Sequence, residues 1–257
     1  MELVQYSCED RIGRIRLCRP EKRNALNENM VGDILKAFDT AEKDDTAKVI
    51  ILEAEGDVFC AGADLGYLQQ LQKNTYEENL ADSRFLKSLF ERIYNFPKVV
   101  IAKVHGHAIA GGAGLATVCD LVYTVPEAKF GYTEVGIGFI PAIVSIFLIR
   151  KIGEAKSKDL LLTGRLIDGE TAADFGMVNG VYAPESLDAE VTIIASKMVT
   201  RASQHSLSST KKLIAGVQDM PLAEALDWSA QLNAKGRESA DCQKGIAAFL
   251  NKEKLVW

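Results

Sequence analysis

The stretch Lys98–Pro141, KVVIAKVHGHAIAGGAGLATVCDLVYTVPEAKFGYTEVGIGFIP, decides the fold because it joins an apolar strand, a cluster of glycines and the start of a helix. Val99–Val104 is mostly β-branched and apolar, as in a buried strand, and Gly111, Gly112 and Gly114 follow it closely. We expect these glycines to form a turn between the strand and a helix. The first N–H groups of a helix lack internal partners, so such a turn can bind an anionic oxygen. A tight turn with close helix packing is the simpler interpretation.

A second turn of small residues lies upstream. The apolar run Val49–Glu55 (VIILEAE) is followed by Phe59–Leu65 (FCAGADL), so this turn also comes after a strand. Both turns can then present backbone N–H groups to one ligand. Two donors aimed at one carbonyl oxygen stabilise an enolate better than one donor does, which is the principle of an oxyanion hole. The two stretches together predict an active site.

Composition indicates an ordinary globular protein. The 257 residues are 47% hydrophobic and 25% charged, which is enough to build a large core. The net charge of −5 argues against nucleic acid as a partner, because proteins that bind phosphate backbones carry clustered basic surfaces. Five cysteines without CxxC spacing, and a start without an apolar signal core, predict reduced thiols in a cytoplasmic protein. No apolar run reaches the roughly 20 residues of a membrane span, and no cluster has the spacing of a metal site.

Strand and helix patterns alternate through most of the chain. The apolar runs Val49–Glu55, Val99–Val104 and Asp120–Val125 each adjoin a helical segment, which predicts an α/β fold of stacked ββα turns. From about residue 196 only helical periodicity remains. We therefore expect a core of residues 1–195 that contains the active site, and a helical domain of residues 196–257.

Short motifs spread over the whole chain carry a family resemblance. They are RPEKRNALN, VFCAGADL, IAGGAGLATVCD, AKFGYTEVGIGFIP, TGRLIDGETAADFGMVN and GIAAFLNK, in that order. With them the chain resembles the crotonase superfamily, the enoyl-CoA hydratase/isomerase family, from end to end. The resemblance implies a crotonase-like ββα superhelix whose C-terminal helical domain mediates trimers, often paired as hexamers. It also implies an acyl-CoA thioester as substrate, with no metal and no cofactor other than the coenzyme A of that substrate.

The resemblance also assigns residues to the site. The two oxyanion-hole amides fall on Ala63 and Gly111, in agreement with the two small-residue turns described above. Contacts to coenzyme A fall in three segments: Lys22, Arg23 and Ala25 in the first, Ala61 and Leu65 in the second, and Phe249 and Lys252 in the third. The third segment would come from a neighbouring subunit. The basic pair at 22–23, which alone suggests only solvated charges, thereby gains the phosphates of coenzyme A as a partner.

Acid and base chemistry rests on one matched glutamate. Hydratases that this chain resembles commonly carry two glutamates, and Glu134 in FGYTE matches the second. The first falls on Gly114, where we expect the missing side chain to make room for a branched or carboxylated acyl chain. Apolar neighbours of Glu134, such as Ile137, Phe139 or Ile143, should raise its pKa and prepare it to act as both acid and base.

Three functions remain open. The segment TEVGIGFIPAIVSIFLIRKIG most resembles bacterial methylglutaconyl-CoA hydratases of leucine breakdown, which also have glycine at the first position, so we favour a hydratase, a lyase, for a branched enoyl-CoA. A single carboxylate also suits an enoyl-CoA isomerase that moves a proton between C2 and C4. A non-catalytic acyl-CoA binder is the third possibility.

Other polar residues of the central stretch have structural interpretations as well. Tyr132 either lines the acyl pocket or packs in the core, and the sequence supports both equally. We expect His105 and His107, which lie beside the glycines, to be hydrogen-bonded structural residues rather than bases.

Overall fold

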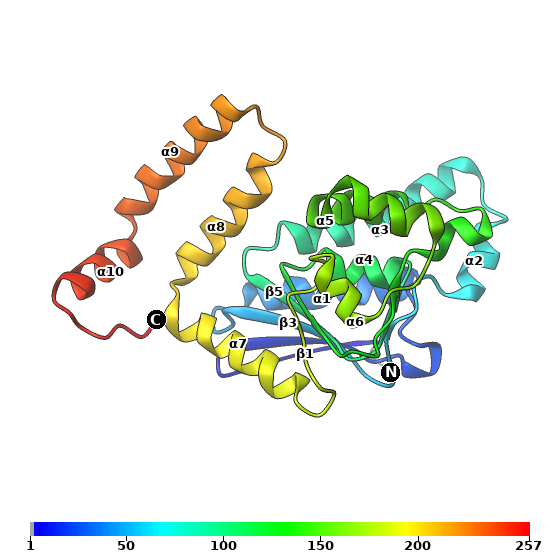
Figure 1. The fold of residues 1–257 in the computed structure, drawn as a ribbon, viewed down its shortest axis with the longest axis horizontal. Coiled ribbons are helices and arrows are strands. Elements are labelled where there is room, and N and C mark those ends of the chain that lie inside the picture. Colours follow the sequence, from blue (N-terminus) through cyan, green and yellow to red (C-terminus); the bar gives the residue numbers. More distant parts are fainter. Residues whose placement is uncertain (1–2) are drawn as a thin grey trace.

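Two β-sheets form the centre of the molecule. The computed structural model describes residues 3–257, and its ribbon is shown in Figure 1. The larger sheet has the order β1-β2-β3-β5-β7-β9, in which β1 and β2 are antiparallel and all other neighbours are parallel, and the smaller sheet is β4-β6-β8. The strands are β1 Val4–Glu9, β2 Ile12–Leu17, β3 Val49–Ala54, β4 Val58–Cys60, β5 Val99–Val104, β6 His107–Ile109, β7 Leu121–Thr124, β8 Phe130–Gly131 and β9 Gly180–Val181.

The strands alternate between the two sheets in a repeating pattern. β3, β5 and β7 belong to the larger sheet, the strands that follow them (β4, β6 and β8) belong to the smaller sheet, and a helical segment follows each pair. This alternation confirms the predicted ββα superhelix. The sequence does not reveal the second strand of each turn, because two or three residues are too few to show a periodic pattern.

Capping residues fix where the helices begin. Asn27 accepts a hydrogen bond from the Met30 N–H at 2.9 Å, as its position before an amphipathic run predicts. Thr75 and Glu78 form a capping box at the break between two consecutive helices. The helices are α1 Glu28–Lys43, α2 Leu65–Leu71, α3 Tyr76–Tyr94, α4 Gly111–Thr117, α5 Ala142–Thr163, α6 Gly169–Asp174, α7 Leu187–Arg201, α8 Gln204–Val217, α9 Leu222–Glu238 and α10 Ala240–Leu250, with 3-10 turns η1 Pro20–Lys22 and η2 Thr133–Ile137.

Helices cover both faces of the larger sheet. β3 and β5 lie at its centre and are buried on both faces, which explains their continuous apolar sequences. α1 packs on one face with Ile34 and Phe38 fully buried. α7 packs on β2, β3, β5 and β7 with Val191 and Ala195 fully buried.

The C-terminal helices are much less buried. α7 continues through residues 195 and 196, where the domain boundary is predicted, and belongs to the packed core. Beyond it α8, α9 and α10 extend away from the sheets as an open arm (Figure 1). α8 and α9 have no buried residue, and α10 has one, Ala248. These three helices therefore gain little stability from burial within one chain.

Candidate active site

Backbone hydrogen bonds join the two segments that carry the predicted coenzyme A contacts. The Leu26 N–H donates to Gly62 O at 2.7 Å, and the Asp64 N–H donates back to Leu26 O at 2.9 Å. The Ala61 N–H donates to Arg23 O at 3.0 Å. The structure thus places Lys22, Arg23 and Ala25 beside Ala61, Ala63 and Leu65, as the sequence resemblance requires.

Glycine brings the two predicted oxyanion-hole turns into contact. A Cβ atom on Gly62 would lie 2.8 Å from Ile109 O and 2.9 Å from Ala110 Cβ, so only glycine permits this approach. Gly62 precedes Ala63, and Ala110 precedes Gly111. Within residues 3–257, neither the Ala63 N–H nor the Gly111 N–H donates a hydrogen bond. Two unpaired amides therefore lie on adjoining turns, where a thioester oxygen can accept from them.

The glycine cluster lies in the helix rather than before it. β6 intervenes between β5 and α4, and Gly111 is the first residue of α4, so the expected turn between the strand and the helix is wrong in detail. The preceding residue, Ala110, has a φ of 51°, which non-glycine residues rarely adopt. A Cβ on Gly112 would lie 2.1 Å from Cys60 O, so this glycine serves close packing of α4 on β4. The packing interpretation is confirmed for Gly112, and the anion-binding role of Gly111 stays a prediction.

Glu134 lies next to these turns with one oxygen unpaired. The Ala110 N–H donates to Gly131 O at 2.7 Å, which ties the segment before Glu134 to the turn before Gly111. In residues 3–257, Glu134 Oε2 is one of three buried side-chain nitrogen or oxygen atoms without a hydrogen-bond partner. Burial raises the pKa of Glu134 above its usual value. A carboxyl group of this kind is suited to exchange protons with a ligand.

Two of the three residues expected to form an apolar wall around Glu134 are largely exposed in this chain. Ile137 and Phe139 are 73% and 60% exposed, and Ile143 is half-buried.

Tyr132 packs in the core and does not line an open acyl pocket. It is fully buried, and its hydroxyl lies 3.0 Å from the Thr117 hydroxyl in α4. Burial raises the pKa of Tyr132, so it stays protonated. The tyrosine thus holds the segment before Glu134 against α4.

Gly114 does not open space for an acyl chain, contrary to expectation. A Cβ at this position would lie 2.1 Å from Val144 Cγ1 and 3.1 Å from Phe90 Cε1. The volume of the missing side chain is already filled by residues of α3 and α5. The sequence does not reveal this contact, because it joins residues 30 positions apart.

A buried hydrogen-bond network supports the coenzyme A segment. Lys22 and Arg23 are exposed, as ligands for phosphates must be. The Asn24 side chain is fully buried and donates to Glu55 O and Val58 O. Arg19 forms an ion pair with Asp64, the N-cap of α2, at 2.8 Å. Sequence reasoning missed Arg19 and Asn24. The one signal in the sequence is that the polar Asn24 directly precedes Ala25, which is buried.

Phe249 and Lys252 do not reach this site within one chain. They lie at the end of α10, on the opposite side of the molecule from α2 in Figure 1. Phe249 is 83% exposed. Their predicted contribution to a coenzyme A site therefore depends on a second chain.

The two histidines of the central stretch have structural contacts. The His105 Nε2 atom lies 2.7 Å from Gly56 O, and His107 Nδ1 accepts from the Lys129 N–H at 3.1 Å. Within residues 3–257, no three His, Cys, Asp or Glu side chains cluster as metal ligands, and no helix could cross a membrane.

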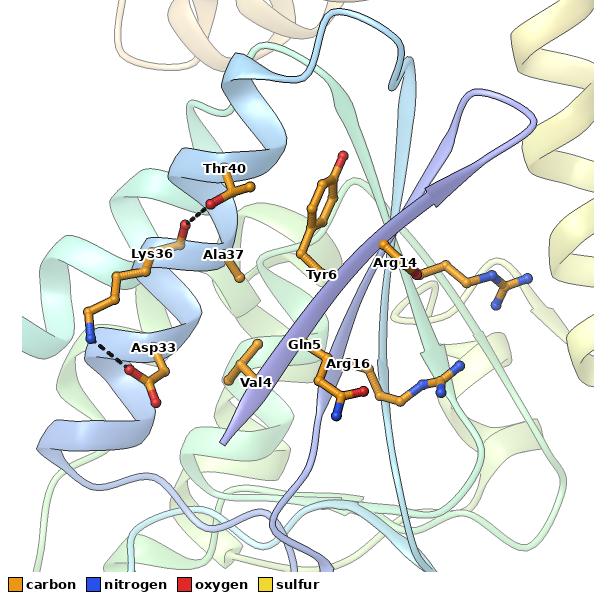
Figure 2. Close-up of a pocket in the computed structure, with 10 residues that line it drawn as sticks. Val4, Gln5, Tyr6, Arg14, Arg16, Asp33, Lys36, Ala37 and Thr40 are labelled. Atoms are coloured by element: carbon orange, nitrogen blue, oxygen red, sulfur yellow. Dashed lines mark hydrogen bonds and ion pairs between the residues drawn. The ribbon is translucent and has the colours of Figure 1, made fainter. Parts of the chain in front are cut away.

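Two hollows lie outside the predicted site. One of about 430 Å³ borders β1 and α1, and Figure 2 shows Arg14 and Arg16 directed away from α1 there. The other, of about 570 Å³, lies between α8 and the core and is lined mainly by apolar residues. Neither of these two hollows is lined by Glu134, Ala63 or Gly111.

Comparison with known proteins agrees with this geometry. The sequence profile described as enoyl-CoA hydratase/isomerase matches residues 7–257. The chain belongs to the enoyl-CoA hydratase/isomerase family. It is 42% identical over 233 residues, 91% of this chain and 92% of the relative, to a provisionally named enoyl-CoA hydratase of Thermus thermophilus. It is 30% identical to the 2,3-dehydroadipyl-CoA hydratase of Escherichia coli, in an alignment that covers 98% of this chain and 96% of that relative.

Solved structures of the enoyl-CoA hydratase/isomerase family share the whole fold. An enoyl-CoA hydratase from Mycobacterium smegmatis superposes with a TM-score of 0.94 at 28% identity, covering 100% of this chain and 99% of that one. The crotonase fold predicted from the motifs is thereby confirmed. The chain is an enzyme of this family, and an acyl-CoA substrate is consistent with it.

Proposed function

We propose that this enzyme hydrates the double bond of an enoyl-CoA with Glu134 as its single acid and base. The Ala63 and Gly111 amides hold the thioester oxygen. Ionised Glu134 takes a proton from water as the water oxygen bonds to C3, and the same carboxyl group then gives a proton to C2 of the enolate. The reaction needs no cofactor beyond the coenzyme A of the substrate.

One observation carries this proposal. Glu134 Oε2 is buried and unpaired beside the turn that precedes Gly111. An unpaired buried acceptor is costly in a folded protein, and a substrate proton or water would satisfy it. The raised pKa of Glu134 brings its acid and base forms closer in free energy near neutral pH.

The acyl group is proposed to be a branched enoyl chain such as 3-methylglutaconyl. Support comes from the likeness of the Glu134 segment to methylglutaconyl-CoA hydratases. Lys22 and Arg23 would bind the phosphates of coenzyme A, since both are exposed beside the Ala61–Leu65 turn. Leu65, which is 79% exposed, would contact the adenine.

An isomerase is the second candidate, and Gly114 favours it. With Val144 in the place of a side chain at 114, the site holds one matched carboxylate, and a 1,3-proton shift requires only one. In that reaction Glu134 removes a proton from C2 and returns it to C4.

We also propose that the chain assembles as a trimer or a hexamer of paired trimers through α8, α9 and α10. Apolar side chains on this arm are exposed in one chain, among them Leu222, Leu226 and Leu250. Assembly would bury them and bring Phe249 and Lys252 to a neighbour's coenzyme A. Light scattering at micromolar concentration should give three or six times 28.1 kDa, and a 28.1 kDa monomer would contradict the assembly.

The test of function is a substrate panel with Glu134→Gln. The parent should hydrate crotonyl-CoA or 3-methylglutaconyl-CoA, measured as loss of enoyl absorbance, and should leave a 3-enoyl-CoA unchanged. Glu134→Gln keeps the shape but cannot accept the proton, so turnover should fall about 10²-fold or more with little change in binding of the thioester.

Each remaining outcome selects a different function. Conversion of the 3-enoyl-CoA to the conjugated isomer would replace the hydratase by the isomerase. Binding of all three thioesters without turnover would leave a non-catalytic binder. Near-normal rates in Glu134→Gln would remove Glu134 from the mechanism.

A further inference from the structure

Backbone pairing with Leu26 sets the direction of the Ala63 amide. The Leu26 N–H donates to Gly62 O at 2.7 Å, and the Asp64 N–H donates to Leu26 O at 2.9 Å, so Ala63 is bridged to Leu26. Gly62 C=O and the Ala63 N–H belong to one trans peptide bond, in which the two groups point in opposite directions. The Ala63 N–H therefore points away from Leu26, and its direction depends on how residues 62–64 are held.

Three donors fix the carboxylate of Asp64, the residue after Ala63. Asp64 Oδ1 accepts from the Gly66 N–H at 2.8 Å and from the Tyr67 N–H at 3.2 Å, which caps α2. Asp64 Oδ2 pairs with Arg19 Nη1 at 2.8 Å. The two side chains of this pair are only 13% and 14% exposed, so salt screens their attraction weakly.

The same guanidinium group holds the turn that carries the exposed basic pair, Lys22 and Arg23. Arg19 Nη1 donates to Ala25 O at 3.2 Å, and the Arg19 N–H donates to Asn24 Oδ1 at 2.9 Å. Arg23 and Asn24 have φ values of 50° and 52°, which non-glycine residues rarely adopt. Both ends of the turn are thus fastened to Arg19, and its backbone has little freedom to adjust.

We propose that Arg19 is a positioning residue that couples the binding of the coenzyme A phosphates to the alignment of the Ala63 amide. This inference rests on the proposed function, because it takes Lys22 and Arg23 as the phosphate ligands and Ala63 as an oxyanion donor. Phosphates bound to the basic pair hold the turn in place. Arg19 then holds Asp64, and with it the preceding amide, in line with the thioester oxygen.

The coupling lets a remote part of the substrate act on the reaction step. The negative charge on the thioester oxygen is largest in the transition state, so an aligned amide stabilises that state more than the bound substrate. Binding energy from the nucleotide is then expressed as a faster reaction step, and a substrate without the nucleotide loses kcat as well as affinity.

The test compares two thioesters of one acyl group. One is an enoyl-CoA that the parent turns over, and the other is the pantetheine thioester of the same acyl group, which lacks the nucleotide and its phosphates. In the parent, kcat should be about tenfold higher for the enoyl-CoA, because a misplaced reacting group can cost up to about 10²-fold. Arg19→Gln should bring this ratio of kcat values close to one, mainly through slower turnover of the enoyl-CoA.

Asp64→Asn breaks the ion pair without removing the cap of α2. Asparagine caps a helix as well as aspartate does, so α2 should keep its start. The ratio of kcat values should fall as in Arg19→Gln, and the double variant should lower it no further, because both substitutions break one contact. Arg19→Lys retains a positive charge for Asp64 but not the planar fork, so it should restore only part of the ratio.

Arg92→Gln is the matched control. Arg92 is another partly buried arginine, and its ion pairs with Asp39 and Glu42 join α3 to α1. Its loss should lower the melting temperature and leave the ratio of kcat values unchanged. If Arg19→Gln and Asp64→Asn also lower only the melting temperature, their ion pair is structural and the inference falls.

Failure of this inference and failure of the proposed function give different results. A parent ratio near one, or unchanged ratios in the Arg19 and Asp64 variants, removes the coupling, and loss of turnover in Glu134→Gln would still support the acid and base assignment. Near-normal turnover in Glu134→Gln removes that assignment, and a ratio that falls in Arg19→Gln keeps the coupling. A parent without turnover of any thioester would remove both.

Discussion

Two glutamates whose carboxylate oxygens are buried, Glu53 and Glu134, have opposite surroundings in this protein. Glu53 lies in β3 with 1% of its surface exposed, and both of its oxygens are paired. Glu134 lies in η2 with one buried oxygen that has no partner. The comparison teaches that burial of a carboxyl group does not by itself indicate a functional site, because a buried carboxylate with paired oxygens can be structural.

Glu53 joins the larger sheet to α7. Its carboxylate forms ion pairs with Arg14 at 2.8 Å, Arg16 at 2.7 Å and Lys103 at 2.6 Å, from β2 and β5 on either side. Arg14 and Lys103 also pair with Asp188 at the start of α7. Figure 2 shows Arg14 and Arg16 on the side of the sheet away from α1.

The pKa values of the two glutamates move in opposite directions. Burial alone would raise the pKa of Glu53, but its hydrogen bonds and charge attraction with Lys103 and Arg16 outweigh burial and lower it. Nothing comparable offsets burial at Glu134, so its pKa is raised. The first carboxylate stabilises the fold in its charged form, and the second is held ready for a proton.

The largest expected effect is on stability at Glu53. Glu53→Gln leaves Arg16 without its partner and weakens the pairing of Lys103, so urea unfolding should show a loss of about 3 kcal/mol, the cost of breaking a buried ion pair. The charged form stabilises the fold above the unfolded pKa of about 4.3, and this contribution is lost as the pH falls through the lowered folded value. A parent-like urea midpoint at pH 7 would show that the pairing is not stabilising.

The same substitution at Glu134 should have the smaller effect on stability. Its raised pKa means that the protonated form suits the fold, so its stabilising contribution is present below the unfolded pKa and is lost as pH rises through the folded one. Glu134→Gln mimics the protonated form. Its urea midpoint should therefore equal or exceed that of the parent at pH 8 and match it at pH 4. A loss comparable to that of Glu53→Gln would make Glu134 a structural residue.

The sequence predicts the repeated fold well because its signals are local. The β-branched runs of β3 and β5, the Asn27 cap and the break before Thr75 each depend on residues close in the chain. The sequence does not predict the strands β4, β6 and β8, because these short segments are extended through pairing with strands distant in the chain and have no pattern of their own.

The site is predictable only where it follows matched motifs. Ala63, Gly111 and Glu134 are found in this way, and the structure places them on neighbouring turns. The sequence does not predict the packing of Val144 on Gly114, because a glycine has no side chain from which a contact could be inferred. The sequence alone also leaves Glu53 as a charged residue inside an apolar run, since its partners Arg14, Arg16 and Lys103 come from two other strands, β2 and β5.

The most direct test of the central claim is the pH dependence of kcat/KM for the parent and Glu134→Gln. If Glu134 is the unpaired base, its raised pKa places the loss of activity at low pH above the ordinary glutamate value of about 4.3, and this acid limb is absent from the residual activity of Glu134→Gln. Circular dichroism over the same range controls for unfolding. An acid limb at or below 4.3, or one that persists in Glu134→Gln, would contradict the account.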